Sequence, residues 1–317
     1  MKLEIGRSGR MEPEAGAWPT DKAGVLAVAR SWMDPGLARI DEAAVAALAP
    51  GSIRLAPQAL APKAPGRAQL RGAIERALAF NSINHMFWRV AADGRFERHQ
   101  RNGKVGAEAM ASSFAAAWED PGSPIAKARL GEALDEAAVA AVFGDLPDLP
   151  GRVRILNEVL LGPALGQAAG EIEAAAERGE SLGVAQAARL ASLFPQAYGD
   201  EALKKAQLAV SMAWRQAGEA GLAVGCELTA FADYQIPNAL RSLGIVQYGE
   251  ALAARVDARE LIEAGSREER AIRGASILAV EQLAAAQGAR VADVDLWLWL
   301  RRNEVKTPFH LTVTTLY

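Results

Sequence analysis

The sequence has few of the side chains that bind metals or form disulfides. Among its 317 residues there is one cysteine, Cys226, and only three histidines, His85, His99 and His310, which lie far apart. A single cysteine excludes an internal disulfide, which is typical of a reducing compartment. The CxxC and HExxH spacings, the EF-hand loop and the glycine-rich loops GxGxxG and GxxxxGK(S/T) are all missing. We therefore expect no metal site and no nucleotide cofactor held by a glycine-rich loop.

The sequence also lacks a basic excess and any long apolar run. Its net charge is −3 and its pI is about 5.8. This balance argues against a general binder of nucleic-acid backbones, although it leaves room for a local basic pocket that takes one phosphate. No apolar stretch approaches the ~20 residues of a membrane helix, and the N-terminal stretch lacks the apolar core of a secretory signal. We expect a cytoplasmic protein without a membrane or nucleic-acid partner, and no feature indicates an obligate protein partner.

What is present is mostly alanine-rich sequence with helical spacing of apolar residues. The clearest helix is expected over 266–288, where Ser266 is a good N-cap, Glu269 can complete a capping box and Gly288 can end the helix. The same pattern predicts helices within 152–180 and 200–221, and near 21–33, 41–49, 66–79, 107–118 and 126–142.

Two segments depart from the helical pattern. Residues 83–103 carry aromatic-rich ends around Asp93 and Gly94, which is a hairpin signal. The closing stretch 309–317 alternates apolar and polar residues and is rich in β-branched types, which predicts a strand. The sequence thus predicts a mainly α protein with a small β-sheet or hairpin element. We expect one domain over 1–317, with residue 150 as the point where two lobes would meet.

The stretch "ELTAFADYQIPN" at 227–238 places an acid, Asp233, among apolar residues and just before a helix that Pro237 would help to start. One interpretation is a capping carboxylate, which is the usual role of an aspartate before a helix. The other is a partly desolvated carboxylate that faces a pocket and stabilises positive charge or orients water.

Three other segments concentrate polar and aromatic groups. "KKAQLAVSMAW" carries Lys204, Lys205 and Gln207, which form either the solvated edge of an amphipathic helix or a set of donors to a substrate. "NSINHMFW" is either a strand with a buried aromatic face or a wall that stacks on a base and reads its edge. In "DVDLWLWLRR", Trp297 and Trp299 lie two residues apart and so face different sides of a helix.

These segments resemble, in order, the blocks of a known family. "LTAFADYQIPNALRSLGIVQY" is similar to the most recognisable block of the queuosine salvage proteins, the queuosine 5'-phosphate N-glycosylases. "ARIDEAAVAALA", "INHMFW", "LFPQAYGDEALKKAQLA", "REERAIRGASILAVEQL", "DVDLWLW" and "PFHLTVTTLY" follow the family's order. Each block alone is weak, but the ordered set spans nearly the whole chain.

The resemblance implies a mostly helical fold related to helix-hairpin-helix DNA glycosylases. It implies hydrolysis of the N-glycosidic bond of queuosine 5'-monophosphate, with release of queuine for tRNA modification and without a cofactor. The catalytic carboxylate of the family corresponds to Asp233. The site lysine corresponds to Lys205, or to Lys204 if the alignment shifts by one residue.

The resemblance also suggests the substrate contacts. Phe87 and Trp88 would stack on the base, Asn84 would read its edge, and Tyr234 and His310 are further contacts. The side arm of the base is cationic, and either Glu227 or Asp295 would meet it.

Three residues depart from the family pattern. His85 stands where the family has phenylalanine, Gln235 where it has arginine, and Asn238 where it has glutamine. His85 falls where a base is expected to stack, so it bears most on base preference. An N-glycosidase for another purine or deazapurine nucleotide, and a non-catalytic nucleoside-binding protein, are therefore alternative functions.

Overall fold

The computed structural model describes residues 18–48, 51–53, 66–91 and 93–317. The N-terminal stretch in which we found no secretory signal lies outside these residues, as does the last residue of the helix expected at 41–49. The helices are α1 Lys22–Ser31, α2 Glu42–Ala47, α3 Leu70–Ser82, α4 Ala107–Glu119, α5 Pro124–Ala128, α6 Glu136–Phe143, α7 Leu149–Leu160, α8 Ala164–Glu177, α9 Val184–Leu193, α10 Pro195–Tyr198, α11 Lys204–Glu219, α12 Gln235–Ser242, α13 Glu250–Asp257, α14 Arg267–Gln287 and α15 Val291–Leu300, with short 3-10 turns η2 Arg67–Gln69 and η3 Arg301–Asn303. The strands are β1 Ala38–Ile40, β2 Trp88–Val90, β3 Phe96–Arg98, β4 Gln100–Arg101, β5 Lys104–Val105, β6 Leu182–Gly183, β7 Cys226–Glu227 and β8 Val246–Tyr248.

The strands form small two-stranded pairs, and the rest of the described chain is mainly helical. β1 pairs with β8, β2 with β3 and β4 with β5 in antiparallel fashion, while β6 and β7 are parallel. This arrangement confirms the predicted mainly α fold with small β elements. Among the described residues, no helix combines the length and apolar content that a membrane span requires.

The best-marked helix of the sequence, α14, begins and ends where its caps predict. The Ser266 side chain accepts a hydrogen bond from the Glu269 amide at 3.2 Å, and Gly288 ends the helix in the left-handed region with a φ of 59°. The Glu269 carboxylate accepts from the Gly265 amide at 3.1 Å. The expected capping box is therefore half formed, because Glu269 reaches the residue before the N-cap.

The single helix expected at 126–142 is wrong, because the chain breaks there into α5 and α6. Gly131 between them has a φ of 101°, which glycine adopts without strain. The side chain of Asn157, on α7, accepts from the Leu134 amide at 2.8 Å and donates to the Leu134 carbonyl at 2.9 Å. Asn157, which is distant in sequence, thus satisfies the backbone between α5 and α6. The local spacing of apolar residues cannot predict this contact.

The hairpin predicted at 83–103 is confirmed. β2 and β3 pair with Trp88 opposite Arg98 and Val90 opposite Phe96, and Gly94 occupies the turn with a φ of 83°. A second small pair, β4–β5, follows at once and leads into the start of α4.

The strand predicted at 309–317 is wrong. Within the described residues this segment makes one isolated bridge, between Leu311 and Leu261, and no ladder. Burial does not alternate along it, since His310, Leu311 and Thr312 are buried in a row. Leu311 and Tyr317 pack in a cluster with Met86, Trp88 and Tyr234, so the tail packs against the start of the β2–β3 hairpin without pairing to it as a strand.

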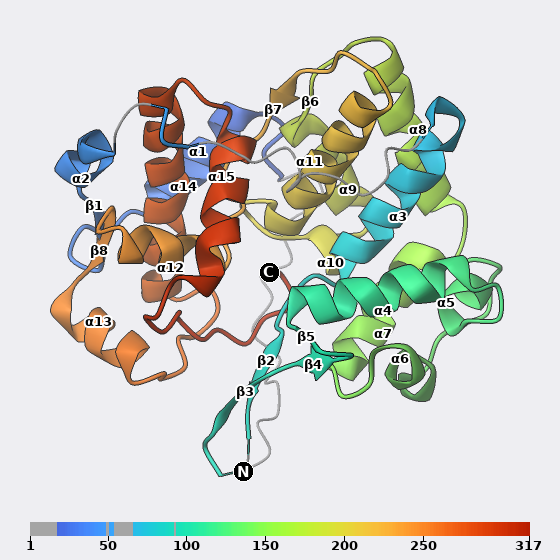
Figure 1. Ribbon diagram of the computed structural model, residues 1–317, viewed down its shortest axis with the longest axis horizontal. Helices are drawn as coiled ribbons and strands as arrows, with labels where there is room; N and C mark the ends of the chain where they lie inside the picture. Colours follow the sequence, from blue (N-terminus) through green and yellow to red (C-terminus); the bar gives the residue numbers. More distant parts are fainter. Residues whose placement is uncertain (1–17, 49–50, 54–65, 92) are drawn as a thin grey trace.

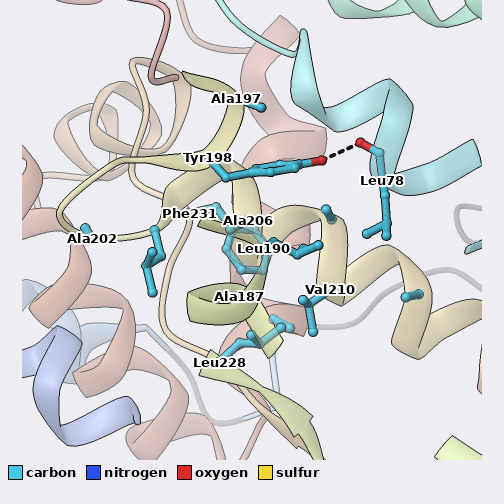
Figure 2. Close-up of a cluster of buried hydrophobic side chains, with 14 of the residues drawn as sticks. Leu78, Ala187, Leu190, Ala197, Tyr198, Ala202, Ala206, Val210, Leu228 and Phe231 are labelled. Carbon is cyan, nitrogen blue, oxygen red and sulfur yellow. Dashed lines mark hydrogen bonds between the residues drawn. The ribbon is translucent and has the colours of Figure 1, made fainter. Parts of the chain in front are cut away.

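The core is built by helices that pack in two groups, with the C-terminal tail between them. Figure 1 shows α14 and α15 beside α1 on one side and α3 to α8 on the other, with α9 to α11 between them. Figure 2 shows how the centre is joined: the hydroxyl of Tyr198 donates to the carbonyl of Leu78 on α3. Leu190 and Val210 are fully buried nearby, and burial of such side chains contributes roughly 1.5–3 kcal/mol each. These contacts join α10 to α3, and α11 packs on α3 as well.

Candidate active site

Asp233 lies at the start of α12, and both of its carboxylate oxygens are engaged. Oδ1 accepts from the backbone amides of Gln235 at 2.6 Å and Ile236 at 3.3 Å, as a carboxylate at a helix N-terminus does. Oδ2 lies 3.3 Å from Nζ of Lys204, and the Asp233 side chain keeps 13% of its surface exposed. Asp233 therefore caps α12 and also pairs with Lys204, and its carboxylate remains partly exposed.

The two adjacent lysines point in different directions. Lys204 is the first residue of α11 and directs its ammonium toward Asp233. Lys205 is fully buried and donates from Nζ to the Ser82 carbonyl at 2.6 Å. Burial lowers the pKa of Lys205 well below its usual value, and the charges of Lys204 and Arg152 lower it further. The structure thus brings Lys204 to Asp233, and a catalytic role for Lys205 stays a prediction.

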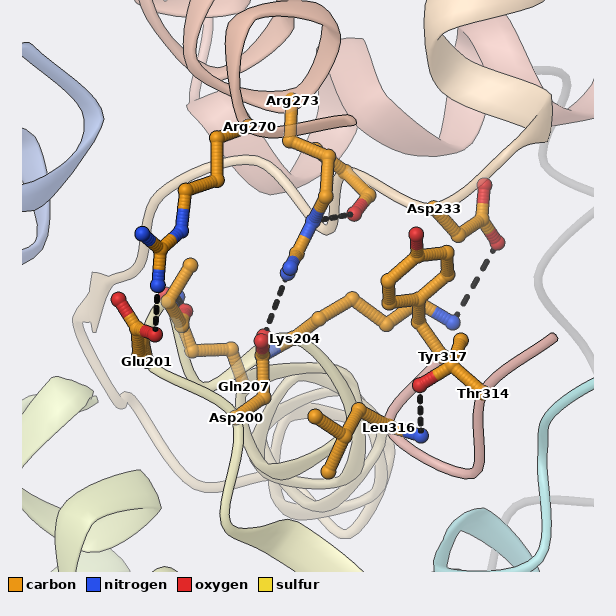
Figure 3. Close-up of polar contacts among 12 residues, drawn as sticks. Asp200, Glu201, Lys204, Gln207, Asp233, Arg270, Arg273, Thr314, Leu316 and Tyr317 are labelled. Atoms are coloured by element: carbon orange, nitrogen blue, oxygen red, sulfur yellow. Dashed lines mark hydrogen bonds and ion pairs between the residues drawn. The ribbon is translucent and has the colours of Figure 1, made fainter. Parts of the chain in front are cut away.

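A buried network fixes both partners of this pair (Figure 3). Asp200 Oδ2 accepts from the Lys204 amide at 2.8 Å and from Arg273 Nη2 at 2.6 Å. Arg273 also donates through Nε to the carbonyl of Ala232 at 3.1 Å, directly before Asp233. Although burial opposes its charge, Asp200 and Glu269 raise the pKa of Arg273. One guanidinium therefore ties the start of α11 to the loop that carries the carboxylate.

Asp295, on α15, is a second carboxyl beside the pair. Its Oδ2 accepts from the Phe231 amide at 2.8 Å. Burial raises the pKa of Asp295 to about 7, and the negative charge of Asp233 acts in the same direction. Near neutral pH this carboxyl therefore retains much of its proton.

This shift predicts a pH-dependent stability. Between the ordinary pKa of an aspartate and about 7, the folded protein holds a proton that the unfolded chain releases, so stability falls as pH rises. We expect Asp295→Asn to unfold at nearly the same denaturant concentration as the native sequence at pH 4 but to be more stable at pH 8, by up to roughly 4 kcal/mol. Urea unfolding of both proteins across this range measures the difference. A difference that is constant from pH 4 to pH 8 would contradict the assignment.

Two histidines near the pair are buried and uncharged. Burial lowers the pKa of His310 to about 4, and its two ring nitrogens have no hydrogen-bond partner among the described residues. His85 is enclosed beside Asp148, with Nε2 3.4 Å from Oδ2, and burial lowers its pKa well below the usual value. Within the described residues, no group of three or more His, Cys, Asp or Glu side chains is placed to hold a metal.

A small pocket, partly open to solvent, has Asp233 in its wall. Asn84, Phe87 and Tyr234 also line it, together with Trp299 from the end of α15. Tyr234 is itself fixed by stacking on Phe309, with ring centroids 4.6 Å apart. The structure therefore brings three of the predicted substrate contacts to the same cavity as the carboxylate.

Other predicted contacts lie away from this wall. His85 and Trp88 are not among the described lining residues, and Trp88 stacks instead on Phe96 at a centroid distance of 6.2 Å. Glu227 is exposed on β7 opposite Gly183, and no hydrogen bond or ion pair among the described residues joins it to Asp233. The amide of Gln207 is engaged with Thr229 and the Ala202 carbonyl, which indicates a structural role.

Arg152, on α7, supports the loop that carries the lining residues. Its guanidinium is fully buried and donates to the carbonyls of Ile83, His85 and Met86. This one side chain satisfies the polar backbone of the turn between α3 and β2, where Met86 adopts a φ of 37°. Asn84 and Phe87 are placed at the pocket as a consequence.

Sequence reasoning missed the basic side of the pocket, which Arg98 and Arg302 line beside Glu108. The spacing of the tryptophans in "LWLWLRR" predicts only that the two rings face different sides of a helix. Trp297 is buried in the core whereas Trp299 reaches the pocket, as their two-residue separation predicts. The arginines themselves look like ordinary surface residues.

The fold and the site define a mainly helical protein with a carboxylate in the wall of a small pocket that aromatic side chains also line. The family model described as queuosine salvage protein matches residues 66–317, so the chain belongs to the queuosine salvage protein family, which confirms the resemblance. It is 34% identical over 266 residues to the queuosine 5'-phosphate N-glycosylase/hydrolase of Sphaerobacter thermophilus, covering 76% of this chain and 80% of that protein. It is 28% identical over 286 residues to the protein of the same name from Mus musculus, covering 76% and 82%.

Proposed function

We propose that the protein hydrolyses the N-glycosidic bond of queuosine 5'-monophosphate and releases queuine. The names of its relatives describe this activity. The observation that carries the proposal for this chain is the placement of Asp233. It is held by two backbone amides and by Lys204, in the wall of a pocket that Phe87 and Tyr234 also line.

The chemistry of the base explains why the sugar needs a carboxylate. A 7-deazaguanine has carbon where an ordinary purine has N7, so the leaving group cannot be activated by protonation there. As the C1'–N bond breaks, its electron pair goes to the base and the ribose becomes oxocarbenium-like. A fixed carboxylate beside C1' stabilises this positive charge. It can also accept a proton from the water whose oxygen bonds to C1', while the departing base nitrogen takes up a proton from solvent.

The contacts of Asp233 suit both tasks. The amides of Gln235 and Ile236 hold one oxygen, so the carboxylate does not need to reorganise as charge develops. The ammonium of Lys204 orients the other oxygen. The reaction then needs little acid assistance, unlike the paired-carboxylate scheme of O-glycosidases.

The remaining pocket residues have supporting roles. Phe87 walls the base and Asn84 reads its edge, while neither Asp295 nor Glu227 is among the described residues that line the pocket, so neither is assigned to the cationic side arm. Of the three departures from the family pattern, only Gln235 lines the pocket. Asn238 is bonded to Thr307 instead, through its amide nitrogen at 3.0 Å. These positions favour the queuosine substrate over an altered base.

Mass-spectrometric detection of free base after incubation with queuosine 5'-monophosphate, queuosine or GMP tests the proposal. We expect release of queuine from the monophosphate and no release of guanine from GMP. Absence of release from the monophosphate by folded protein would reject the glycosidase. Binding without release would then identify a nucleoside-binding protein.

A further inference from the structure

Two guanidinium groups line the pocket, in addition to the aromatic side chains. Arg98 ends β3 and Arg302 lies in η3, so they come from segments that are distant in the sequence. Among the described residues, no carboxylate lies within ion-pair distance of Arg98, and its Nη2 would be 3.4 Å from a Cβ built on Gly106. Arg98 thus reaches the start of α4 with its charge unpaired.

Arg302 is held more firmly than Arg98. Its guanidinium lies over the Trp299 ring, 3.5 Å from the ring centroid, and Nη1 donates to the Trp299 carbonyl at 3.1 Å. Nη2 pairs with Glu108 in the first turn of α4. The Arg302 side chain keeps 11% of its surface exposed, whereas Glu108 keeps 55%. The carboxylate is therefore the partner that is free to move away.

The net charge of this wall favours an anion. The two guanidiniums are close enough that Arg98 lowers the pKa of Arg302, in addition to the larger effect of burial. The only carboxylate paired with either of them, among the described residues, is Glu108. A phosphate monoester carries more negative charge than a carboxylate and can accept bidentate hydrogen bonds from an arginine.

We propose that Arg98 and Arg302 bind the 5'-phosphate of the substrate, and that Glu108 pairs with Arg302 until the phosphate displaces it. This inference rests on the proposed function and identifies the residues that recognise the phosphate. Asp233 lines the same cavity, so a ribose between it and the arginines would have C1' at the carboxylate and its 5' end at the guanidiniums. Because Glu108 competes for Arg302, a nucleoside without a phosphate gains no binding free energy from the two arginines.

Binding of ribose 5-phosphate and of ribose to the full chain, by calorimetry, tests the subsite without turnover. We expect the native sequence to bind ribose 5-phosphate and not ribose. Arg98→Gln should weaken ribose 5-phosphate binding by at least about tenfold, since it removes charge-assisted hydrogen bonds. Glu108→Gln should strengthen it, because Arg302 is then free. The matched control is Arg95→Gln on the same hairpin, whose side chain is 72% exposed and pairs with Asp93, and it should bind as the native sequence does.

A turnover measurement adds a second readout. For queuosine 5'-monophosphate, Arg98→Gln should raise KM at least about tenfold with little change in kcat. Equal binding of ribose 5-phosphate by the native protein and Arg98→Gln would overturn the subsite. Failure of base release with intact, Arg98-dependent binding of ribose 5-phosphate would reject the glycosidase and leave the subsite standing.

Discussion

Replacing Asp233 by asparagine is expected to abolish base release from queuosine 5'-monophosphate while leaving the fold intact. The asparagine oxygen can still accept from the amides of Gln235 and Ile236, so the start of α12 keeps its cap. The negative charge that faces the oxocarbenium-like ribose is lost, and with it the acceptor for the proton of water. We expect kcat to fall by at least about 10³-fold. Single-turnover kinetics with mass-spectrometric detection of the base measures the effect.

Two further measurements separate catalysis from capping. The variant should unfold near the temperature of the native protein and should still bind the substrate, which titration of the unreactive complex can show. Asp257→Asn is the matched control, because Asp257 is a half-exposed carboxylate that pairs with Arg241 on the surface, and its loss should leave turnover unchanged. If Asp233→Asn turns over at the native rate, the carboxylate is a cap and nothing more.

How well the sequence predicts the fold depends on whether the determinants are local. The caps of α14 are a serine and a glycine at the ends of one apolar repeat, and the helix begins and ends there. The break between α5 and α6 depends on Asn157, because its side chain satisfies the backbone hydrogen bonds of Leu134 from outside that segment. Apolar and polar residues alternate at 309–317 as in a strand, but whether such a segment pairs depends on a partner strand elsewhere in the chain, and the tail instead packs on Trp88 and Tyr234.

The same distinction applies to the site. Asp233 can be found from the sequence because an acid in an apolar run before a helix is unusual, and its block resembles the family. Arg98, Glu108 and Arg302 come from three segments, and each looks like a solvated surface residue in its own segment. Their convergence depends on how η3 packs beside the start of α4 and the β2–β3 hairpin. No pattern within a single segment of the sequence predicts that packing.

The neighbouring lysines show the limit of carrying a family role onto one position. Lys204 and Lys205 are adjacent, so a shift of one residue in the alignment exchanges them, but successive side chains of a helix point about 100° apart. Lys204 pairs with Asp233 and Lys205 with the Ser82 carbonyl. The two substitutions should therefore have different consequences.

Lys204→Met is expected to lower kcat/KM by about 10²-fold with little loss of stability, because Asp233 Oδ2 loses the partner that orients it. Lys205→Met is expected to lower stability by about 1–3 kcal/mol, because the buried Ser82 carbonyl loses its donor, with turnover close to native below the unfolding transition. Kinetics and urea unfolding of both variants give the comparison, and each protein serves as the other's control. An inactive but stable Lys205→Met beside an active Lys204→Met would reverse the assignment. In that case the buried amine of Lys205, whose pKa burial lowers, would have to reach the substrate through a rearrangement of the turn at Ser82.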